Sequence, residues 1–548
     1  MMCKEFKPTI NGNRPLKCAR VYCINLPLAG IESGACSPPR SLATLPTNFL
    51  CSESNQRCLF QIRRVRRQRA MLEPLKRAVK TVMVRRLLDA EKRKRAHLPS
   101  GFDGLGPGLW GCGINDKGHL SAQGVDLVEL AQSLGTPRHV VDHDRLIANY
   151  QDFVEAFRNY LPKVNLATSY KTNPLPGVIQ ALHAAGTWAE VISEFELWLA
   201  LKLGVPPERI VLNGPGKGPV AIEMGVSHGI GLINLDGPDE IPWVLASARR
   251  AGRRQDVGLR VVTSVGWTSQ FGTRIDSGEA FDAFAEMARH PELNPCGLHV
   301  HLGTGIKDVG AYMSAVREVL ECSLALRSRH NIRISCYDFG GGFAVPTVRS
   351  LDEWDGRMLA LGFSARLATP DDCPKPGDYA LPISRLIREF HPEPDEQQPQ
   401  ILFEPGRAIT SGAQILLLKV LVAKRARESP TKLILDGGKN ITMPLGWETH
   451  QVFAASKMST PEAEAYDLYG PLCHPGDVVA RNKRLPPTKA GDVVAIMDAG
   501  AYFIPNQMNF SLPRPPVSML KQGRITEIRA AESFADIVKL DDLRGDNA

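Results

Sequence analysis

Lys171 lies in the segment VNLATSYKTNP and is followed by five short motifs that carry reactive or conformationally special residues. In chain order these motifs are GLHVHLGTG (297–305), YDFGGGF (337–343), LFEPGR (402–407), GPLCHPGD (470–477) and DAGAYF (498–503). Together they supply an amine, an imidazole, a glycine-rich loop, a carboxylate near an arginine, and a thiol. An amine can hold an aldehyde as an exchangeable imine, and a glycine-rich loop can bind a phosphate group. The set therefore predicts a site for pyridoxal 5′-phosphate.

Each reactive residue has a defined task in this chemistry. Lys171 would hold the cofactor as a Schiff base. Glu404 would face the pyridinium nitrogen and keep it protonated, so that the ring accepts the electrons left by bond cleavage; the alternative is a structural ion pair with Arg407. His301 would stack on the ring, and the thiol of Cys473 would be the general acid that returns a proton to the substrate carbon.

The cofactor phosphate needs close backbone amides and hydrogen-bond donors. Three consecutive glycines lack Cβ atoms, which lets backbone N–H groups approach a phosphate. An arginine can add a charge-assisted bond, and two hydroxyl groups lie in the neighbouring motifs. The predicted phosphate ligands are Gly340, Gly341, Gly342, Thr304, Arg407 and Tyr502.

The elements that must position these residues recur regularly from residue 164 onward. Short apolar, β-branched segments alternate with amphipathic stretches, a pattern typical of parallel strands joined by helices. Eight such strands predict a closed (β/α)8 TIM barrel, with an open doubly wound sheet as the alternative. The predicted strands are VNLATSY (164–170), WAEVIS (188–193), RIVLNG (209–214), GLINLD (231–236), VGLRVV (257–262), CGLHVHLG (296–303), RISCYDFG (333–340) and QILFEPG (400–406). The reactive residues follow the strand ends, where such barrels carry their chemistry.

The whole sequence divides into four parts. The barrel is predicted over 140–407, with a Pro-rich and acidic insertion at 344–399. Residues 408–548 contain short strands with Gly, Pro and Asp turns, which predicts a C-terminal antiparallel β-domain. Strand-like segments within 98–139 are expected to pair with that domain. Residues 1–97 form a basic leader that we expect to be poorly ordered.

The net charge of +8 belongs to this leader and not to the whole chain. Residues 1–59 carry +4 and residues 60–97 carry +11, which leaves −7 on the rest, so the charge does not indicate a nucleic-acid-binding protein. Three interpretations of the leader stay open. The first is that translation starts at Met71 or Met83. The second is a basic amphipathic helix for an anionic membrane or acidic partner, and the third is a transit peptide.

Composition excludes two further classes. No apolar run of about 18 residues exists, so no transmembrane segment is predicted. Six of the twelve cysteines fall within the first 58 residues without C-x-x-C spacing, so no metal site is expected there. The other cysteines suit the reduced thiols of a cytoplasmic enzyme.

The motifs resemble, in order, those of the fold-type III pyridoxal phosphate decarboxylases. The resemblance extends from about residue 110 to the C-terminus and is strongest to diaminopimelate decarboxylases, with ornithine and arginine decarboxylases as relatives. It implies α-decarboxylation of an amino acid and a homodimer with shared active sites, in which the partner supplies the thiol-bearing loop. It also adds Glu196 to the cofactor-binding residues. The motifs are SYKTNP, AEVISEFEL, NGPGKG, FGTRI, HVHLGTG, DFGGGF, EPGRAI, GPLCHPGD and DAGAY.

Two departures from the family pattern concern the substrate. Diaminopimelate decarboxylases usually have Arg-Pro before an aromatic residue, where this chain has Met443-Pro444 and Trp447. They also have an acidic residue after the catalytic cysteine, where this chain has His474. An acid suits a distal ammonium group, whereas a protonated imidazole favours an anion. These three side chains are therefore the predicted substrate determinants.

Alternative functions follow from these departures. One is decarboxylation of a modified amino acid, such as a citrate-conjugated diamino acid of siderophore biosynthesis. Another is a catalytically inactive regulator that binds pyridoxal phosphate. Retention of both Lys171 and Cys473 argues against the regulator.

Overall fold

The computed structural model describes residues 101–267, 269–425 and 430–542, together with residues 78, 79, 82, 83, 85 and 86. These six leader residues are helical and exposed, and the other predictions for residues 1–97 lie outside the described residues. The chain divides into a unit of residues 1–93 and a unit of residues 94–548, and the second contains all the predicted site residues. Within the described residues, no helix combines the length and apolar character that crossing a membrane requires.

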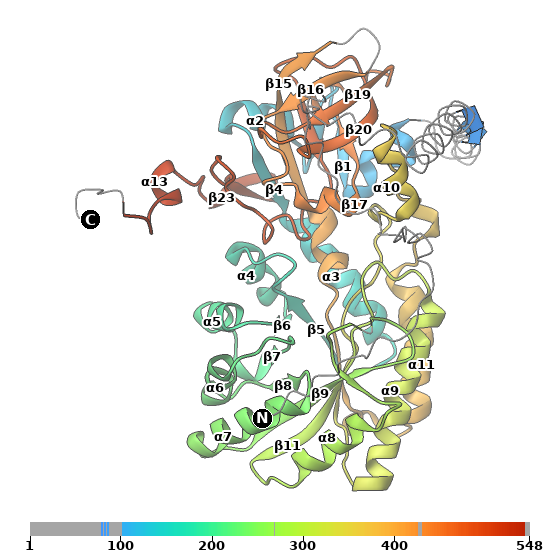
Figure 1. Cartoon of the computed structure of the whole chain (residues 1–548), viewed down its shortest axis with the longest axis vertical. Helices are drawn as coiled ribbons and strands as arrows, with labels where there is room; N and C mark the ends of the chain where they lie inside the picture. The colour runs from blue at the N-terminus through green and yellow to red at the C-terminus, as the bar shows by residue number, and fades with distance from the viewer. Residues whose placement is uncertain are drawn as a thin grey trace, which may run out of the picture. The chain divides into compact units, whose positions relative to one another are not determined.

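Eight parallel strands close into a barrel, which confirms the predicted fold class (Figure 1). Each strand pairs with the next, β8 pairs with β9, and β14 returns to β5. β10 (Thr273–Arg274) extends the sheet beside β9. The barrel strands are β5 (Val164–Ser169), β6 (Trp188–Val191), β7 (Ile210–Leu212), β8 (Leu232–Leu235), β9 (Gln255–Val262), β11 (Leu293–His299), β12 (Cys336–Asp338) and β14 (Gln400–Phe403).

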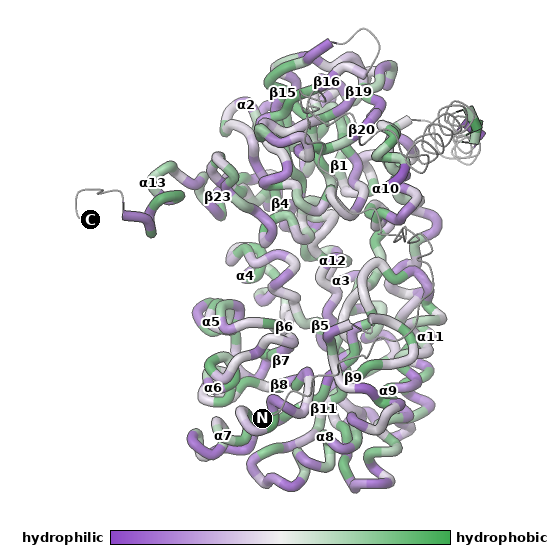
Figure 2. The backbone as a smooth tube through the Cα atoms, viewed as in Figure 1, coloured by the Kyte–Doolittle hydropathy of each residue, from purple (hydrophilic) through white to green (hydrophobic). Residues whose placement is uncertain are grey.

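Helices cover the outside of the barrel. Several begin at a side chain that accepts a backbone N–H, such as Ser193 before α5 and Asp308 before α9. Figure 2 shows the mixed hydrophobic and hydrophilic character of these outer helices, which bury one face against the strands. They are α3 (His143–Arg158), α4 (Pro176–Ala184), α5 (Glu194–Lys202), α6 (Pro219–His228), α7 (Ile241–Ala251), α8 (Glu279–Ala288), α9 (Val309–His330) and α11 (Pro376–Phe390).

The C-terminal β-domain is built around the long strand β15 (Gln414–Lys424), which pairs antiparallel with β4, β16 and β21. Most pairs are antiparallel, but β16 with β19 and β4 with β22 are parallel. A separate three-stranded sheet contains β1, β2 and β3, and α2 (Leu127–Leu134) follows it. The other strands are β1 (Cys112–Ile114), β2 (Leu120–Ala122), β3 (Val125–Asp126), β4 (Arg138–Asp142), β16 (Thr431–Leu435), β18 (Val452–Phe453), β19 (Glu464–Tyr469), β20 (Val478–Leu485), β21 (Val493–Ile496), β22 (Val517–Lys521) and β23 (Arg524–Arg529).

The insertion between β12 and β14 has its own secondary structure. It contains β13 (Arg349–Ser350) and α10 (Glu353–Ala360) ahead of α11. β13 pairs antiparallel with β17 (Glu448–Thr449), so the insertion contributes a strand beside the β-domain segment 440–450. The short helices α12 (Gly406–Thr410) and α13 (Phe534–Ile537) complete the fold.

A buried histidine in β4 makes stability depend on pH. His139 is fully buried between the side-chain amides of Gln414 and Gln507, at 2.9 and 3.0 Å. Burial, and then the charge of Arg529, lower its pKa from 6.5 to about 3. Below pH 6.5 the unfolded chain therefore binds a proton that the folded chain does not. The contribution of neutral His139 to the free energy of unfolding is therefore largest above pH 6.5. As the pH is lowered, it falls by about 1.4 kcal/mol per pH unit until the pH reaches the pKa of the folded state.

We expect the free energy of unfolding of the wild type, measured with urea, to fall with this slope between pH 6.5 and 5. The fall should be smaller in a His139→Gln variant. His228, an exposed histidine at the end of α6, provides the matched control. A His228→Gln variant should keep the wild-type slope. Equal slopes in the wild type and His139→Gln would show that His139 does not titrate in this way.

Candidate active site

Lys171 lies just beyond the carboxyl end of β5, at the barrel mouth. Its Nζ donates to both carboxylate oxygens of Glu190 in β6, at 2.8 and 2.9 Å. Burial alone lowers the pKa of Lys171, but the negative charges of Glu190 and Glu404 outweigh burial and raise the pKa above its ordinary value. The lysine side chain keeps 31% exposure and is accessible from the barrel mouth. It is therefore held as an ammonium ion that must lose a proton before it acts as a nucleophile.

Glu404, at the end of β14, lies in the same buried cluster. Asn213 donates through Nδ2 to Oε1 of Glu404 at 2.5 Å and to Oε1 of Glu190 at 3.3 Å, so one amide bridges the two carboxylates. Nε2 of His299 and Nδ1 of His301 each lie 3.8 Å from Glu404. Burial raises the pKa of Glu404, but the interactions with His301 and His299 and the charge of Lys171 outweigh burial and keep the pKa of Glu404 below its usual range. Glu404 is therefore ionised.

Asp338, at the end of β12, has the opposite character. Burial and then the charge of Glu404 raise the pKa of Asp338 well above its usual range. Its Oδ1 accepts from the Gly340 amide at 3.0 Å, and its Oδ2 accepts from Asn234 at 3.3 Å. One side-chain nitrogen or oxygen atom from each of His299, Asp338 and Glu404 lies within 4.8 Å of the other two. Such a close pair of carboxyl groups carries one negative charge, which resides on Glu404.

The glycine loop after β12 requires glycine at each position. Gly340 and Gly342 have φ values of 62° and 87°, in the left-handed region that favours glycine. A Cβ on Gly341 would lie 2.2 Å from the carbonyl oxygen of Glu404. The Gly341 amide donates to Nδ1 of His301 at 3.1 Å, which connects the loop to the predicted stacking imidazole.

Thr304 and Tyr502 approach this region from two other segments. The exposed turn that contains Thr304 lies beside the glycine loop, because the Ile306 amide donates to the carbonyl of Gly342 at 2.8 Å. The Tyr502 amide donates to the carbonyl of Thr172 at 2.9 Å, next to Lys171. The structure therefore brings the two segments that carry these residues to the barrel mouth.

Arg407 pairs with Glu448 of the β-domain and not with Glu404. Nη1 of Arg407 lies 2.7 Å from Oε2 of Glu448, and Nη2 donates to Oε1 at 3.1 Å. The Arg407 guanidinium lies 5.3 Å from the ring centre of Tyr502. Because a guanidinium has five N–H donors, this pair leaves donors for a phosphate group.

Glu196, a predicted cofactor-binding residue, accepts a hydrogen bond from the backbone of its own segment. It lies in the first turn of α5, where its Oε2 accepts from the Ile192 amide at 2.8 Å. Burial and then the charge of Glu190 raise its pKa to about 7. Among the described residues, no hydrogen bond or ion pair joins Glu196 to Lys171; the carboxylate that contacts the lysine is Glu190.

The predicted substrate determinants fall into two groups. Met443 is half-buried, and Trp447 is 44% exposed; both lie in the segment that leads to Glu448, the partner of Arg407. Cys473 and His474 lie in the exposed loop 470–477, where the Gly476 amide donates to Nδ1 of His474 at 3.0 Å. Across the parts of the chain that the structure describes, no hydrogen bond, ion pair or ring contact joins this loop to Lys171.

The residues at the barrel mouth fit pyridoxal 5′-phosphate. An amine, an ionised carboxylate and a glycine loop without Cβ atoms lie on neighbouring strand ends. Both ring nitrogens of the buried His299 lack a hydrogen-bond partner among the described residues. This arrangement defines a barrel enzyme of the pyridoxal phosphate class.

Comparison with known proteins identifies the family. Residues 147–411 match the model of the pyridoxal-dependent decarboxylase, pyridoxal binding domain. The diaminopimelate decarboxylase of Methanothermobacter thermautotrophicus is 29% identical over 79% of this chain and 97% of its own length. That of Zymomonas mobilis is 29% identical over 77% and 96%. The crystal structure of the Methanocaldococcus jannaschii enzyme superposes with a TM-score of 0.70 at 27% identity, covering 78% of this chain and 97% of that one.

The chain is thus similar over most of its length to the diaminopimelate decarboxylases, and its barrel resembles that of the fold-type III pyridoxal-dependent decarboxylases. Its cofactor is pyridoxal 5′-phosphate, and its reaction class is amino-acid decarboxylation. The predictions of family, cofactor and enzyme class are thus confirmed.

Proposed function

We propose that this protein is an α-decarboxylase that resembles the diaminopimelate decarboxylases in substrate class. The observation that carries the proposal is the Lys171–Glu190 pair at the barrel mouth, connected through Asn213 to the ionised Glu404. When bound, pyridoxal phosphate supplies an electron sink for cleavage of the bond between Cα and the carboxyl group.

The chain's own residues take the following roles in this proposal. Lys171 would hold the cofactor covalently once its ammonium group has lost a proton, and Glu190 would orient its Nζ. Glu404 would hold the ring nitrogen, and its charge would keep that nitrogen protonated. His301 would hold the face of the ring. The phosphate ligands would be Gly340, Gly341, Gly342, Thr304, Arg407 and Tyr502.

We also propose that two copies of the chain share their active sites. Cys473 and His474 are exposed and make no contact with Lys171 of the same chain in the described residues. Large apolar side chains are exposed as well, such as Trp267, which lies 5.9 Å from the ring of His301, and Phe510, which lies 6.3 Å from the ring of His474. A second copy that covers these surfaces would bring its Cys473 to the Lys171 site, where the thiol acts as the proton donor.

The first candidate substrate is meso-diaminopimelate. Support comes from the relatives, which are diaminopimelate decarboxylases, one of them crystallised with L-lysine. The second candidate is a modified amino acid with an anionic distal group. His474 beside the thiol, and Met443 in place of arginine, favour this alternative. The free thiols of Cys296, Cys322 and Cys336 suit a cytoplasmic enzyme.

Release of CO2 by the protein with added pyridoxal phosphate tests both candidates. The panel contains meso-diaminopimelate, lysine, ornithine, arginine and citryl-diaminopropionate. We expect the highest kcat/KM with meso-diaminopimelate, since the similar proteins are diaminopimelate decarboxylases. Turnover of the conjugate alone would make His474 and Met443 the specificity determinants. No CO2 from any of them, with cofactor bound, would overturn the proposal in favour of the inactive regulator.

A further inference from the structure

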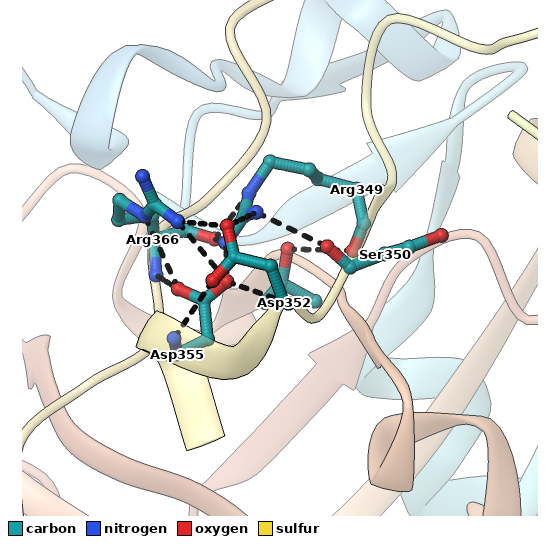
Figure 3. A network of polar contacts seen from close by, with 6 residues as sticks. Arg349, Ser350, Asp352, Asp355 and Arg366 are labelled. Carbon is teal, nitrogen blue, oxygen red and sulfur yellow. Dashed lines mark hydrogen bonds and ion pairs between the residues drawn. The ribbon is translucent and has the colours of Figure 1, made fainter. Parts of the chain in front are cut away.

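Four charged residues of the insertion form a compact ion-pair cluster, shown in Figure 3. The carboxylate of Asp355 pairs with the guanidinium of Arg349 and accepts from Nε of Arg366 at 3.2 Å. Asp352 pairs with Arg366, accepts from the Asp355 amide at 2.9 Å and donates its own amide back to Asp355 at 3.1 Å. We call Arg349, Asp352, Asp355 and Arg366 the insertion cluster.

The insertion cluster differs from an ordinary surface ion pair because its central carboxylate is fully buried. Burial raises the pKa of Asp355, but the guanidiniums of Arg349 and Arg366 outweigh burial and hold the pKa well below its usual range. The Arg357–Glu353 pair on α10 is an ordinary pair by comparison, with side chains 73% and 90% exposed. A buried carboxylate with two arginines and two backbone amides fixes its surroundings, whereas an exposed pair contributes little.

The cluster fixes a strand that adjoins the active site. Arg349 begins β13, whose second residue, Ser350, lies opposite Glu448 in β17. The Leu351 amide donates to the carbonyl of Trp447 at 2.8 Å. The backbone that carries Glu448 is therefore paired with the backbone that the insertion cluster holds.

Glu448 in turn holds Arg407, as both carboxylate oxygens contact the guanidinium. A cavity lies against β17, lined by Leu351, Leu359 and Leu367 of the insertion and by Glu448 itself. Because packing is open on that side, Glu448 has room to withdraw from Arg407 unless the β13–β17 pair holds it in place.

We propose that the insertion cluster is a positioning device that acts through β13 and Glu448 to set Arg407 for the cofactor phosphate. This inference rests on the proposed phosphate role of Arg407. It assigns a function to the long insertion between β12 and β14, which contacts no reacting atom itself. The cluster residues are therefore positioning residues and not catalytic ones.

The test compares binding of pyridoxal 5′-phosphate with binding of pyridoxal, which lacks the phosphate. We expect Asp355→Asn to raise the dissociation constant of pyridoxal phosphate about tenfold, because Arg407 is displaced and one charge-assisted contact with the phosphate is lost. The dissociation constant of pyridoxal should stay within twofold of the wild-type value. Arg366→Lys keeps the positive charge but cannot contact the carboxylate through two nitrogen atoms. It should weaken binding of pyridoxal phosphate, by a smaller factor, and leave binding of pyridoxal unchanged. Both dissociation constants are measured by absorbance titration, and circular dichroism checks folding.

Two controls make the outcome decisive. Arg357→Ala removes the exposed ion pair of the same helix and should leave both constants unchanged. Asp355→Asn added to Glu448→Gln should cause no further loss, since both act through one contact. The proposal would be overturned if Asp355→Asn weakened the binding of pyridoxal and of pyridoxal phosphate equally. It would also be overturned if the effects of Asp355→Asn and Glu448→Gln on binding added in the double variant. Because binding is measured without turnover, failure here is distinct from failure of the proposed decarboxylation.

Discussion

Replacement of Lys171 by alanine is expected to reduce decarboxylation by roughly a thousandfold or more and to remove the visible absorbance of the covalently held cofactor. The reason is geometric as well as chemical. Lys171 is the amine that the barrel mouth presents beside Glu190 and Glu404. Alanine leaves Glu190 buried without its cationic partner, so added methylamine should restore part of the activity by taking the place of the missing ammonium group.

Borohydride reduction followed by peptide mapping provides a readout that does not depend on turnover. In the wild type, the reduced cofactor should be attached to the peptide that contains Lys171. Lys202→Ala removes an exposed lysine at the end of α5 and is the matched control, with unchanged absorbance and activity. Attachment of the cofactor to another lysine would show that the assignment of Lys171 is wrong.

The barrel could be predicted from the sequence because its strands are buried on both faces. Segments such as VNLATSY and RIVLNG are short and contain several apolar and β-branched residues, and each is followed by a helical pattern. The positions after the strand ends were also informative. Lys171, His301 and Glu404 belong to different strands, and closure of the barrel alone brings them to one face. The order of the strands is therefore enough to predict that these three residues lie close together, and no knowledge of side-chain packing is needed.

The choice of carboxylate beside Lys171 could not be predicted in the same way. Glu190 and Glu196 lie six residues apart in AEVISEFEL, and composition does not distinguish them. Glu190 ends a strand that pairs directly with β5, so its side chain reaches the lysine. Glu196 lies one turn into α5 and accepts a backbone N–H instead. The difference depends on where β6 ends and α5 begins, and a strand buried on both faces gives no alternation that marks this boundary.

The partner of Arg407 was missed for a related reason. Sequence proximity suggested Glu404, three residues earlier, but the guanidinium extends to Glu448, 41 residues later. Glu448 lies in β17, which pairs with β13 of the insertion. Two-residue strands such as these have no pattern in the sequence, so their pairing could be found only in the structure.

Mixing two inactive variants is expected to restore activity if the sites are shared between copies. Cys473→Ala should still bind the cofactor but release product about a hundredfold to ten-thousandfold more slowly, because the proton donor is missing. Lys171→Ala lacks the covalent attachment but supplies an intact thiol. In a mixed dimer, one of the two sites combines Lys171 from one copy with Cys473 from the other.

Unfolding and refolding an equimolar mixture should therefore recover about a quarter of the wild-type activity, since half of the dimers are mixed and each of these has one complete site. Cys373→Ala, at a half-buried thiol of the insertion, is the control for cysteine removal and should be fully active alone. Size-exclusion chromatography checks that each variant keeps the oligomeric state of the wild type. A mixture that stays as inactive as its components would mean that Lys171 and Cys473 act within one chain, which would require loop 470–477 to move from its exposed position onto the barrel mouth.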